Sequence, residues 1–180
     1  MDVFESVIAM LLRREGYWIS PSFKVELTKE EKRAIDRGTS PRWEIDILAY
    51  KGATNELLAV ECKSFLDSRG VIFQDGSLQP PSTYKLFSEP RLRDIVLARL
   101  KQQLVESESC PPQSNVRLAL ATGKIAKVTD RDALQAWFDF NDWVLFDDRW
   151  VQDKLRGLQD SRYENDISFV AAKLALRSPK

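Results

Sequence analysis

The chain has 180 residues, of which 43 % are hydrophobic and 30 % are charged, and 27 basic side chains offset 27 acidic ones. These fractions are typical of a soluble globular protein with a single domain, here residues 1–180. Zero net charge makes nucleic-acid binding less expected without excluding it, because charges can segregate onto one face. The absence of histidine excludes Ser-His-Asp triads, His-dependent nucleases and most zinc sites.

Signals for membranes, secretion and disulfides are also missing from the sequence. No run of about 18 apolar residues occurs, so no membrane-spanning helix is predicted. The N-terminus has no basic segment followed by an apolar core, which argues against secretion. The two cysteines, Cys62 and Cys110, do not suggest a disulfide framework. We therefore expect a cytoplasmic protein without a membrane partner.

The first 40 residues predict two helices separated by an extended segment. Apolar residues recur at three- and four-residue spacings over residues 3–12, which predicts a helix that carries Glu5. Residues 17–27 are predicted to be extended. Thr28, with Glu31 three residues later, predicts a capping box at the start of a short exposed helix.

Two apolar runs, residues 43–50 and 57–64, flank a short polar link that contains a glycine and predict a β-hairpin. Charged residues interrupt these apolar strands: Asp46 in the first, and Glu61 and Lys63 in the second. Burying an unpaired charge is costly, so these groups need compensation.

The alternation of side chains along a strand groups these charges. Residues two apart share a face, so Glu61 and Lys63 point the same way and Cys62 points to the opposite layer. Asp46 on the paired strand can stand beside Glu61. Two adjacent carboxylates repel each other unless a proton or a cation lies between them, so the pattern predicts a divalent metal.

Asp46, the Glu61-x-Lys63 pattern and the hairpin that carries them resemble the PD-(D/E)XK nuclease superfamily. The segment 60–64 is most similar to the corresponding motif of the Mrr-like and Holliday-junction-resolvase branches. The resemblance implies an α/β fold with a restriction-endonuclease-like αβββαβ core, in which helices flank a mixed central sheet. Residues 1–123 can be parsed in that order. Ile45 stands where the family name has a proline.

The resemblance also implies a site and a reaction. Asp46, Glu61 and the backbone carbonyl of Cys62 would bind Mg²⁺ or Mn²⁺, Lys63 would position a water and stabilise charge on phosphorus, and Glu5 would complete the site. The implied activity is metal-dependent endonucleolytic hydrolysis of phosphodiester bonds, in DNA rather than RNA. A homodimer or a separate targeting partner is expected for such an enzyme.

The middle of the chain contains the longest irregular stretch, residues 67–91, in which glycines and prolines recur. Because this stretch follows the motif strand, it is predicted to be either a substrate-contacting flap or an insertion without function. Apolar periodicity over 91–105 predicts a helix that carries Gln103, and residues 116–121 predict a buried strand.

The C-terminal extension, about residues 124–180, is predicted to add further α/β elements to the same sheet. Helices are expected over 129–138, 147–158 and 165–176, with a short strand at 143–146. The last helix is predicted to carry Ile167, Val170, Ala171 and Leu174 on one side. The tryptophans at 137, 143 and 150 favour a core or an oligomer interface over base stacking.

Other interpretations remain open. Glu61 and Lys63 are also consistent with a simple ion pair at a strand edge, Glu44 with an exposed strand residue, and Glu5 and Gln103 with helix surface. At the level of the protein, one alternative is a nucleic-acid-binding or assembly module with the same fold and little activity. Another is an unrelated α/β protein in which the carboxylates are structural.

Overall fold

The computed structural model describes residues 2–36, 38, 42–162 and 164–176. Within them lie seven strands, seven α-helices and two short 3₁₀ helices. In chain order these are α1 (Val3–Arg14), β1 (Trp18–Val25), α2 (Lys29–Ala34), β2 (Trp43–Lys51), β3 (Glu56–Lys63), β4 (Ile72–Gln74), β5 (Ser77–Gln79), η1 (Pro81–Thr83), α3 (Lys85–Ser88), α4 (Pro90–Glu106), β6 (Asn115–Thr122), η2 (Val128–Asp130), α5 (Arg131–Phe140), β7 (Val144–Phe146), α6 (Asp148–Gly157) and α7 (Ile167–Leu176). No helix among the described residues is both long enough and apolar enough to cross a membrane.

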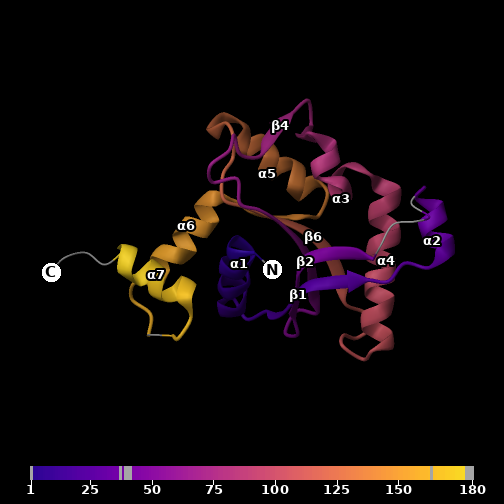
Figure 1. Cartoon of the computed structure of the whole chain (residues 1–180), viewed down its shortest axis with the longest axis horizontal. Coiled ribbons are helices and arrows are strands. Elements are labelled where there is room, and N and C mark those ends of the chain that lie inside the picture. The colour runs from indigo at the N-terminus through magenta and orange to yellow at the C-terminus, as the bar shows by residue number, and fades with distance from the viewer. Residues whose placement is uncertain (1, 37, 39–41, 163, 177–180) are drawn as a thin grey trace.

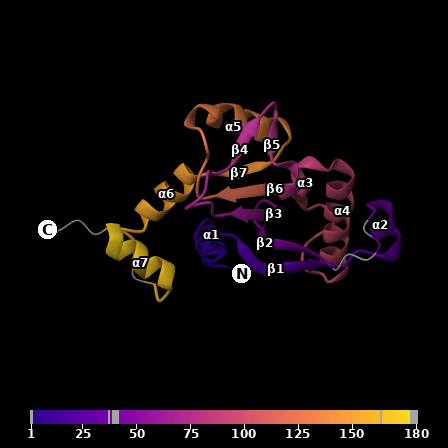
Figure 2. The same ribbon diagram turned by 45° about the horizontal axis from the view of Figure 1, so that its top comes forward.

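Five strands form a mixed central sheet in the order β1-β2-β3-β6-β7. Strands β1, β2 and β3 pair antiparallel, whereas β6 pairs parallel to β3 and β7 parallel to β6. Figure 2 shows this order from β1 at one edge to β7 at the other. The predicted α/β class, with a mixed sheet flanked by helices, is confirmed. Its assignment to the restriction-endonuclease-like fold stays a prediction.

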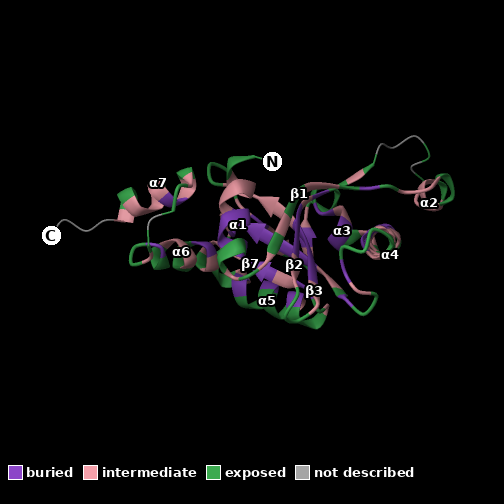
Figure 3. Ribbon diagram, turned by 90° about the horizontal axis from the view of Figure 1, so that it is seen from below, coloured by how far each residue is buried: buried purple, intermediate pink, exposed green. Residues whose placement is uncertain are grey.

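Helices cover both faces of the sheet and enclose two apolar cores. One core lies between the sheet and α1, α6 and α7, and the other between the sheet and α3, α4 and α5. The strands are therefore sandwiched between α1 and α4 (Figures 1 and 3). Both faces of the central strands are buried, because the crossover helices α4 and α5 cover one face and α1, α6 and α7 cover the other.

The predicted N-terminal elements form where local sequence signals placed them. Asp2 caps α1, and its carboxylate accepts the backbone N–H of Glu5 at 2.8 Å. Thr28 caps α2, where Glu31 reciprocates as expected for a capping box. The hairpin of β2 and β3 and the helix α4 are likewise confirmed.

The alternation of side chains along β2 reverses at Asp46. Ile45 packs in the core that faces α4, whereas Ile47 packs in the core that faces α1, although residues two apart normally share a face. On the neighbouring strand β1, Ser22 lies opposite this irregularity and has a left-handed φ of 49°. The reversal frees Asp46 from either core and turns it toward β3.

The prediction that residues 67–91 are irregular is wrong for much of the segment, which is ordered and packed, whereas contact with a substrate stays a prediction. β4 and β5 form a hairpin whose two-residue turn is Asp75-Gly76, both with positive φ, as a type I′ turn requires. The hairpin leads into η1 and α3, and the segment buries Leu78, Tyr84 and Phe87. Three-residue strands are too short to show a periodicity, but the Asp-Gly pair was a visible signal.

The C-terminal elements α5, β7 and α6 match the prediction, with Asp147 as the N-cap of α6. Trp137 and Trp143 make edge-to-face contacts in an aromatic cluster with Phe87 and Phe138, which supports the prediction of a core role. Helix α7 differs from the prediction. The predicted apolar side carries Ile167 and Leu174, which are 85 % and 70 % exposed, and the helix packs instead through Phe169 and Ala172.

Candidate metal and catalytic site

Glu61 and Lys63 lie near the carboxyl end of β3, on the sheet face opposite Cys62. Leu57 and Ala59 belong to the core that faces α4, and alternation places Glu61 and Lys63 on that same face. The side chain of Glu61 is 13 % exposed and that of Lys63 is 25 % exposed, and 3.9 Å separates Lys63 Nζ from Glu61 Oε2. This ion pair is looser than a direct hydrogen bond, so Lys63 compensates the Glu61 charge only in part.

Asp46 reaches the same place from β2. The ladder between the two strands ends at the pair Ile47 and Val60, which makes Asp46 and Glu61 the next residues on each strand. Beyond the ladder, Asp46 Oδ2 accepts the backbone N–H of Cys62 at 2.8 Å. The structure therefore brings the two predicted carboxylates together at the point where β2 and β3 separate.

The backbone of β3 also presents oxygen to this gap. The N–H and C=O groups of one residue in a strand point to the same side, so the Cys62 carbonyl points toward β2 and Asp46. The carbonyl of Lys63 points the other way, since it accepts the Gly123 N–H at 3.1 Å. Of these two carbonyls, only that of Cys62 is directed toward the carboxylates.

The carboxyl of Glu61 is held in an environment that disfavours its charge. Burial is the largest cause, and the nearby Asp46 carboxylate adds to it, so the pKa of Glu61 rises from 4.5 to about 7 although Lys63 opposes the shift. The Cys62 thiol is affected similarly: burial, followed by the charges of Asp46 and Glu5, raises its pKa. A cation placed between the carboxylates would relieve both effects.

Tyr84 is a residue near the site that the sequence did not single out. It lies between η1 and α3, and its side chain is buried. Burial, and secondarily the charge of Glu61, raises the pKa of the Tyr84 phenol to about 12. No local signal in the sequence marks this residue, because it approaches Glu61 only after the segment 71–88 folds onto the sheet.

Glu5 has a different environment from Asp46 and Glu61. Its Oε2 accepts the backbone N–H of Asp2 at 2.9 Å, which closes the capping box of α1. Its charge acts on the Cys62 thiol, on the face that α1 covers, whereas the charges that shift the Glu61 pKa belong to Lys63 and Asp46. The membership of Glu5 in the site therefore stays a prediction, and its described role is to cap a helix.

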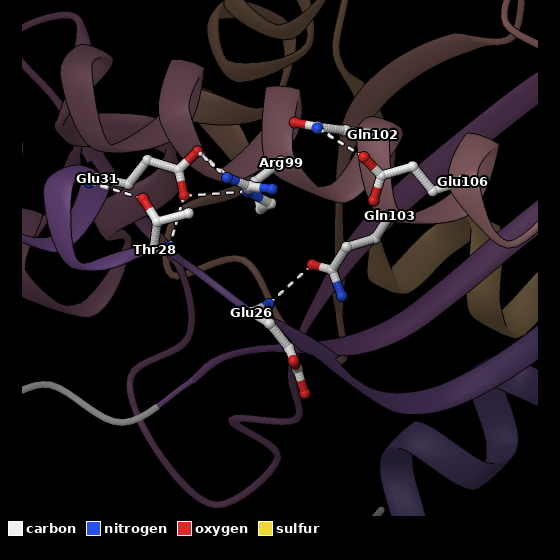
Figure 4. A network of polar contacts seen from close by, with 7 residues as sticks. All are labelled: Glu26, Thr28, Glu31, Arg99, Gln102, Gln103 and Glu106. Atoms are coloured by element: carbon white, nitrogen blue, oxygen red, sulfur yellow. Dashed lines mark hydrogen bonds and ion pairs between the residues drawn. The ribbon is translucent and has the colours of Figure 1, made fainter.

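The two other polar residues considered from the sequence have structural partners. Gln103 links α4 to the end of β1, because its Oε1 accepts the N–H of Glu26 at 2.7 Å (Figure 4) and its Nε2 donates to the Lys24 carbonyl. Glu44 forms an exposed ion pair with Lys24. These contacts favour the structural interpretation of both residues.

The donor set at the site suits a small hard cation. Among the described residues, no three His, Cys, Asp or Glu side chains are grouped so that they could hold a metal ion. Asp46 and Glu61 supply two carboxylates and Cys62 a carbonyl. Mg²⁺ is commonly bound through only one or two carboxylates and completes its shell with waters and substrate phosphate, so the residues fit Mg²⁺ or Mn²⁺.

Comparisons of the chain with protein-family models, with curated proteins and with solved structures found no match. The family resemblance therefore rests on Asp46, Glu61 and Lys63, on the strands that carry them and on the order of the elements. Function has to be inferred from the geometry and chemistry of this site.

Proposed function

We propose that the protein is a metal-dependent nuclease that hydrolyses phosphodiester bonds in DNA. The observation that carries the proposal is the incomplete compensation of Glu61. This nearly buried carboxyl lies beside Asp46, and its cation, Lys63, is 3.9 Å away. Two carboxylates and one ammonium leave a residual negative charge at a place where water is scarce, and a divalent cation would neutralise it.

In this function Asp46, Glu61 and the Cys62 carbonyl bind Mg²⁺ or Mn²⁺. Held there, the metal would supply polarisation of a non-bridging phosphate oxygen and a lower pKa for a bound water. The Cys62 N–H holds the Asp46 carboxylate in place at 2.8 Å. Lys63 keeps its ammonium beside the attacking water and stabilises the charge that develops on phosphorus.

A second candidate is a nucleic-acid-binding or assembly module with the same fold and little activity. One observation favours it: among the described residues the carboxylates at the site do not form a group of three. An intact Lys63 next to the paired carboxylates favours the nuclease. Turnover in the presence of metal distinguishes the two.

The experiment is a cleavage assay on plasmid, single-stranded and four-way-junction DNA with Mg²⁺, Mn²⁺ or EDTA. Asp46→Ala and Lys63→Ala are compared with Lys24→Ala and Glu44→Ala. The latter pair also carries opposite charges on neighbouring strands of the sheet, but its side chains are exposed and paired with each other. We expect metal-dependent cutting by the wild type and by the two control variants. Losses of roughly 100-fold or more are expected in both site variants, the scale of removing a catalytic electrostatic contact.

Cutting that survives in Asp46→Ala and Lys63→Ala would show that the site is wrong. An absence of cutting on every substrate, with native circular dichroism, would favour the binding module. Equal losses in the site and control variants would mean that the substitutions act through folding rather than through chemistry.

A further inference from the structure

The loops that leave the carboxyl ends of β3 and β6 are joined into one unit directly beyond Lys63. Residues 64–71 follow β3, and residues 123–128 follow β6. The Val71 N–H donates to the Lys124 carbonyl at 2.9 Å, and the Ala126 N–H donates to the Val71 carbonyl at 2.8 Å, which forms an isolated parallel bridge between Val71 and Ile125. We call residues 64–71 and 123–128 the double loop.

Two glycines make the close approach of these loops possible. A Cβ added at Gly123 would lie 2.4 Å from the Ser64 carbonyl oxygen, and one at Gly70 would lie 2.9 Å from both the Ala126 nitrogen and the Lys124 carbonyl oxygen. Any larger residue would push the loops apart. A further contact comes from Lys124, whose Nζ donates to the Ser68 carbonyl at 2.6 Å. The double loop is therefore a fixed surface.

The outer side chains of this surface are basic and apolar. The double loop carries three cations, Arg69, Lys124 and Lys127, and one acid, Asp67, in a chain whose net charge is zero. Arg69 and Lys127 are exposed. Leu66 is also exposed, by 64 %, and its side chain lies beside Gly123.

We propose that the double loop binds the DNA strand next to the bond that is cut, with Arg69 and Lys127 on phosphates and Leu66 against a base or deoxyribose. Cations held on a fixed backbone neutralise phosphates at a low cost in conformational entropy. Apolar side chains that accompany such cations pack against the exposed faces of bases. This proposal rests on the proposed function for its substrate, but it concerns binding and not the chemical step.

The test measures binding in EDTA, so that it does not depend on cleavage. Fluorescence anisotropy of a labelled single-stranded and a duplex oligonucleotide is followed at several salt concentrations. The variants are the double substitution Arg69→Ser with Lys127→Ser, and Leu66→Ser. The matched control is Lys29→Ser with Arg33→Ser, two exposed cations of α2, which lies beside α4 at the far side of the molecule from α6 (Figure 1).

We expect the double-loop charge variant to bind at least about tenfold more weakly. The slope of log affinity against log salt concentration should fall in magnitude by about one to two, since each lost phosphate contact removes about 0.7–0.9 from this slope. Leu66→Ser should weaken binding several-fold at an unchanged slope, and the α2 control should bind like the wild type. Wild-type affinity and slope in the charge variant, or no DNA binding by the wild type, would overturn the proposal.

The two proposals can fail separately. DNA binding that depends on the double loop, without cleavage under any metal condition, would support the binding surface and reject the nuclease activity. Metal-dependent cleavage with the same KM in the wild type and the charge variant would leave the nuclease established and remove the surface.

Discussion

Glu56 and Glu61 are acids at the two ends of the same strand, β3, and their surroundings differ. Glu56 accepts a hydrogen bond from the Tyr17 hydroxyl at 2.5 Å and one from Arg117 Nη1 at 2.9 Å. Arg117 in turn donates from Nε to the Asp142 carbonyl at 2.9 Å. Glu61 has Lys63 at 3.9 Å and a second carboxylate, Asp46, as its neighbour.

The difference separates a structural acid from one suited to bind a ligand. A partly buried carboxylate with two direct donors is satisfied, and its partners stabilise the fold. Burial and a neighbouring acid raise the pKa of the Glu61 carboxyl to about 7. When this carboxyl is ionised, it therefore destabilises the folded protein. Groups of the second kind are concentrated at functional sites, where a ligand supplies the missing charge.

The largest expected effect of this contrast is on catalysis. Glu61→Gln should lower metal-dependent DNA cleavage by about 100-fold or more, because it removes a metal ligand and a charge. Glu56→Gln should leave the rate per folded molecule within about twofold, because the hydrogen-bonded network lies at the other end of β3. Single-turnover cleavage rates measured well below the melting temperature check both values. Equal losses of rate in the two variants would contradict the distinction between a structural Glu56 and a catalytic-site Glu61.

Next in size is the pH dependence of stability. Burial raises the pKa of Glu61 from 4.5 to about 7 in the folded state. The free energy of unfolding therefore falls as the pH rises through this range, because the unfolded chain releases this proton more readily than the folded protein does. Without metal, Glu61→Gln should therefore be more stable than the wild type above pH 7, by up to about 3 kcal/mol, and the difference should vanish in acid. Urea titrations across this range measure it, and a difference that stays constant with pH would contradict burial of the Glu61 charge as the cause.

Glu56→Gln should lower the free energy of unfolding by about 2 kcal/mol at neutral pH, the typical loss when charge-assisted hydrogen bonds are broken and partners remain. The Arg117 side chain, 24 % exposed, would lose one carboxylate partner at 2.9 Å and keep the other, Asp142. The control is Glu30→Gln on the exposed surface of α2, which should change stability by less than about 0.5 kcal/mol. A loss in Glu56→Gln no larger than in the control would mean that solvent screens the network.

The smallest expected effect is stabilisation by metal. At a Mg²⁺ or Mn²⁺ concentration about ten times Kd, the wild type should gain about 1.4 kcal/mol, because a ligand that binds only the folded state shifts the equilibrium toward it. Asp46→Asn and Glu61→Gln should gain nothing, whereas Glu56→Gln should gain as much as the wild type. Thermal melting with and without EDTA provides the measurement, and a gain in all four proteins would place the metal elsewhere.

Local sequence signals were sufficient for several parts of this structure. The capping residues Asp147 and Thr28 marked where α6 and α2 begin. Strand alternation placed Glu61 and Lys63 on one face, opposite Cys62, as observed. The Asp75-Gly76 turn was encoded as clearly, but the strands on either side of it are too short to be recognised from their pattern.

Other features depended on partners far away in the chain. The reversal of β2 at Asp46 lies opposite Ser22 of the neighbouring strand, whose φ is left-handed, and no signal next to Asp46 indicates it. Helix α7 has two apolar residues on one side, Ile167 and Leu174, yet it packs through Phe169. Periodicity identified the helix but not the face that the rest of the molecule covers.

The sequence by itself therefore determined the types of the longer elements and the pairing of β2 with β3, since these follow from interactions between residues close in the chain, and it offered Asp46 and Glu61 as candidate metal ligands. Only the tertiary structure decided that Tyr84 approaches Glu61, that the loops after β3 and β6 join, and that Glu61 is buried enough for its pKa to reach about 7. Desolvation and loop contacts are properties of the whole packed molecule, because each depends on which distant segments exclude water from a given place.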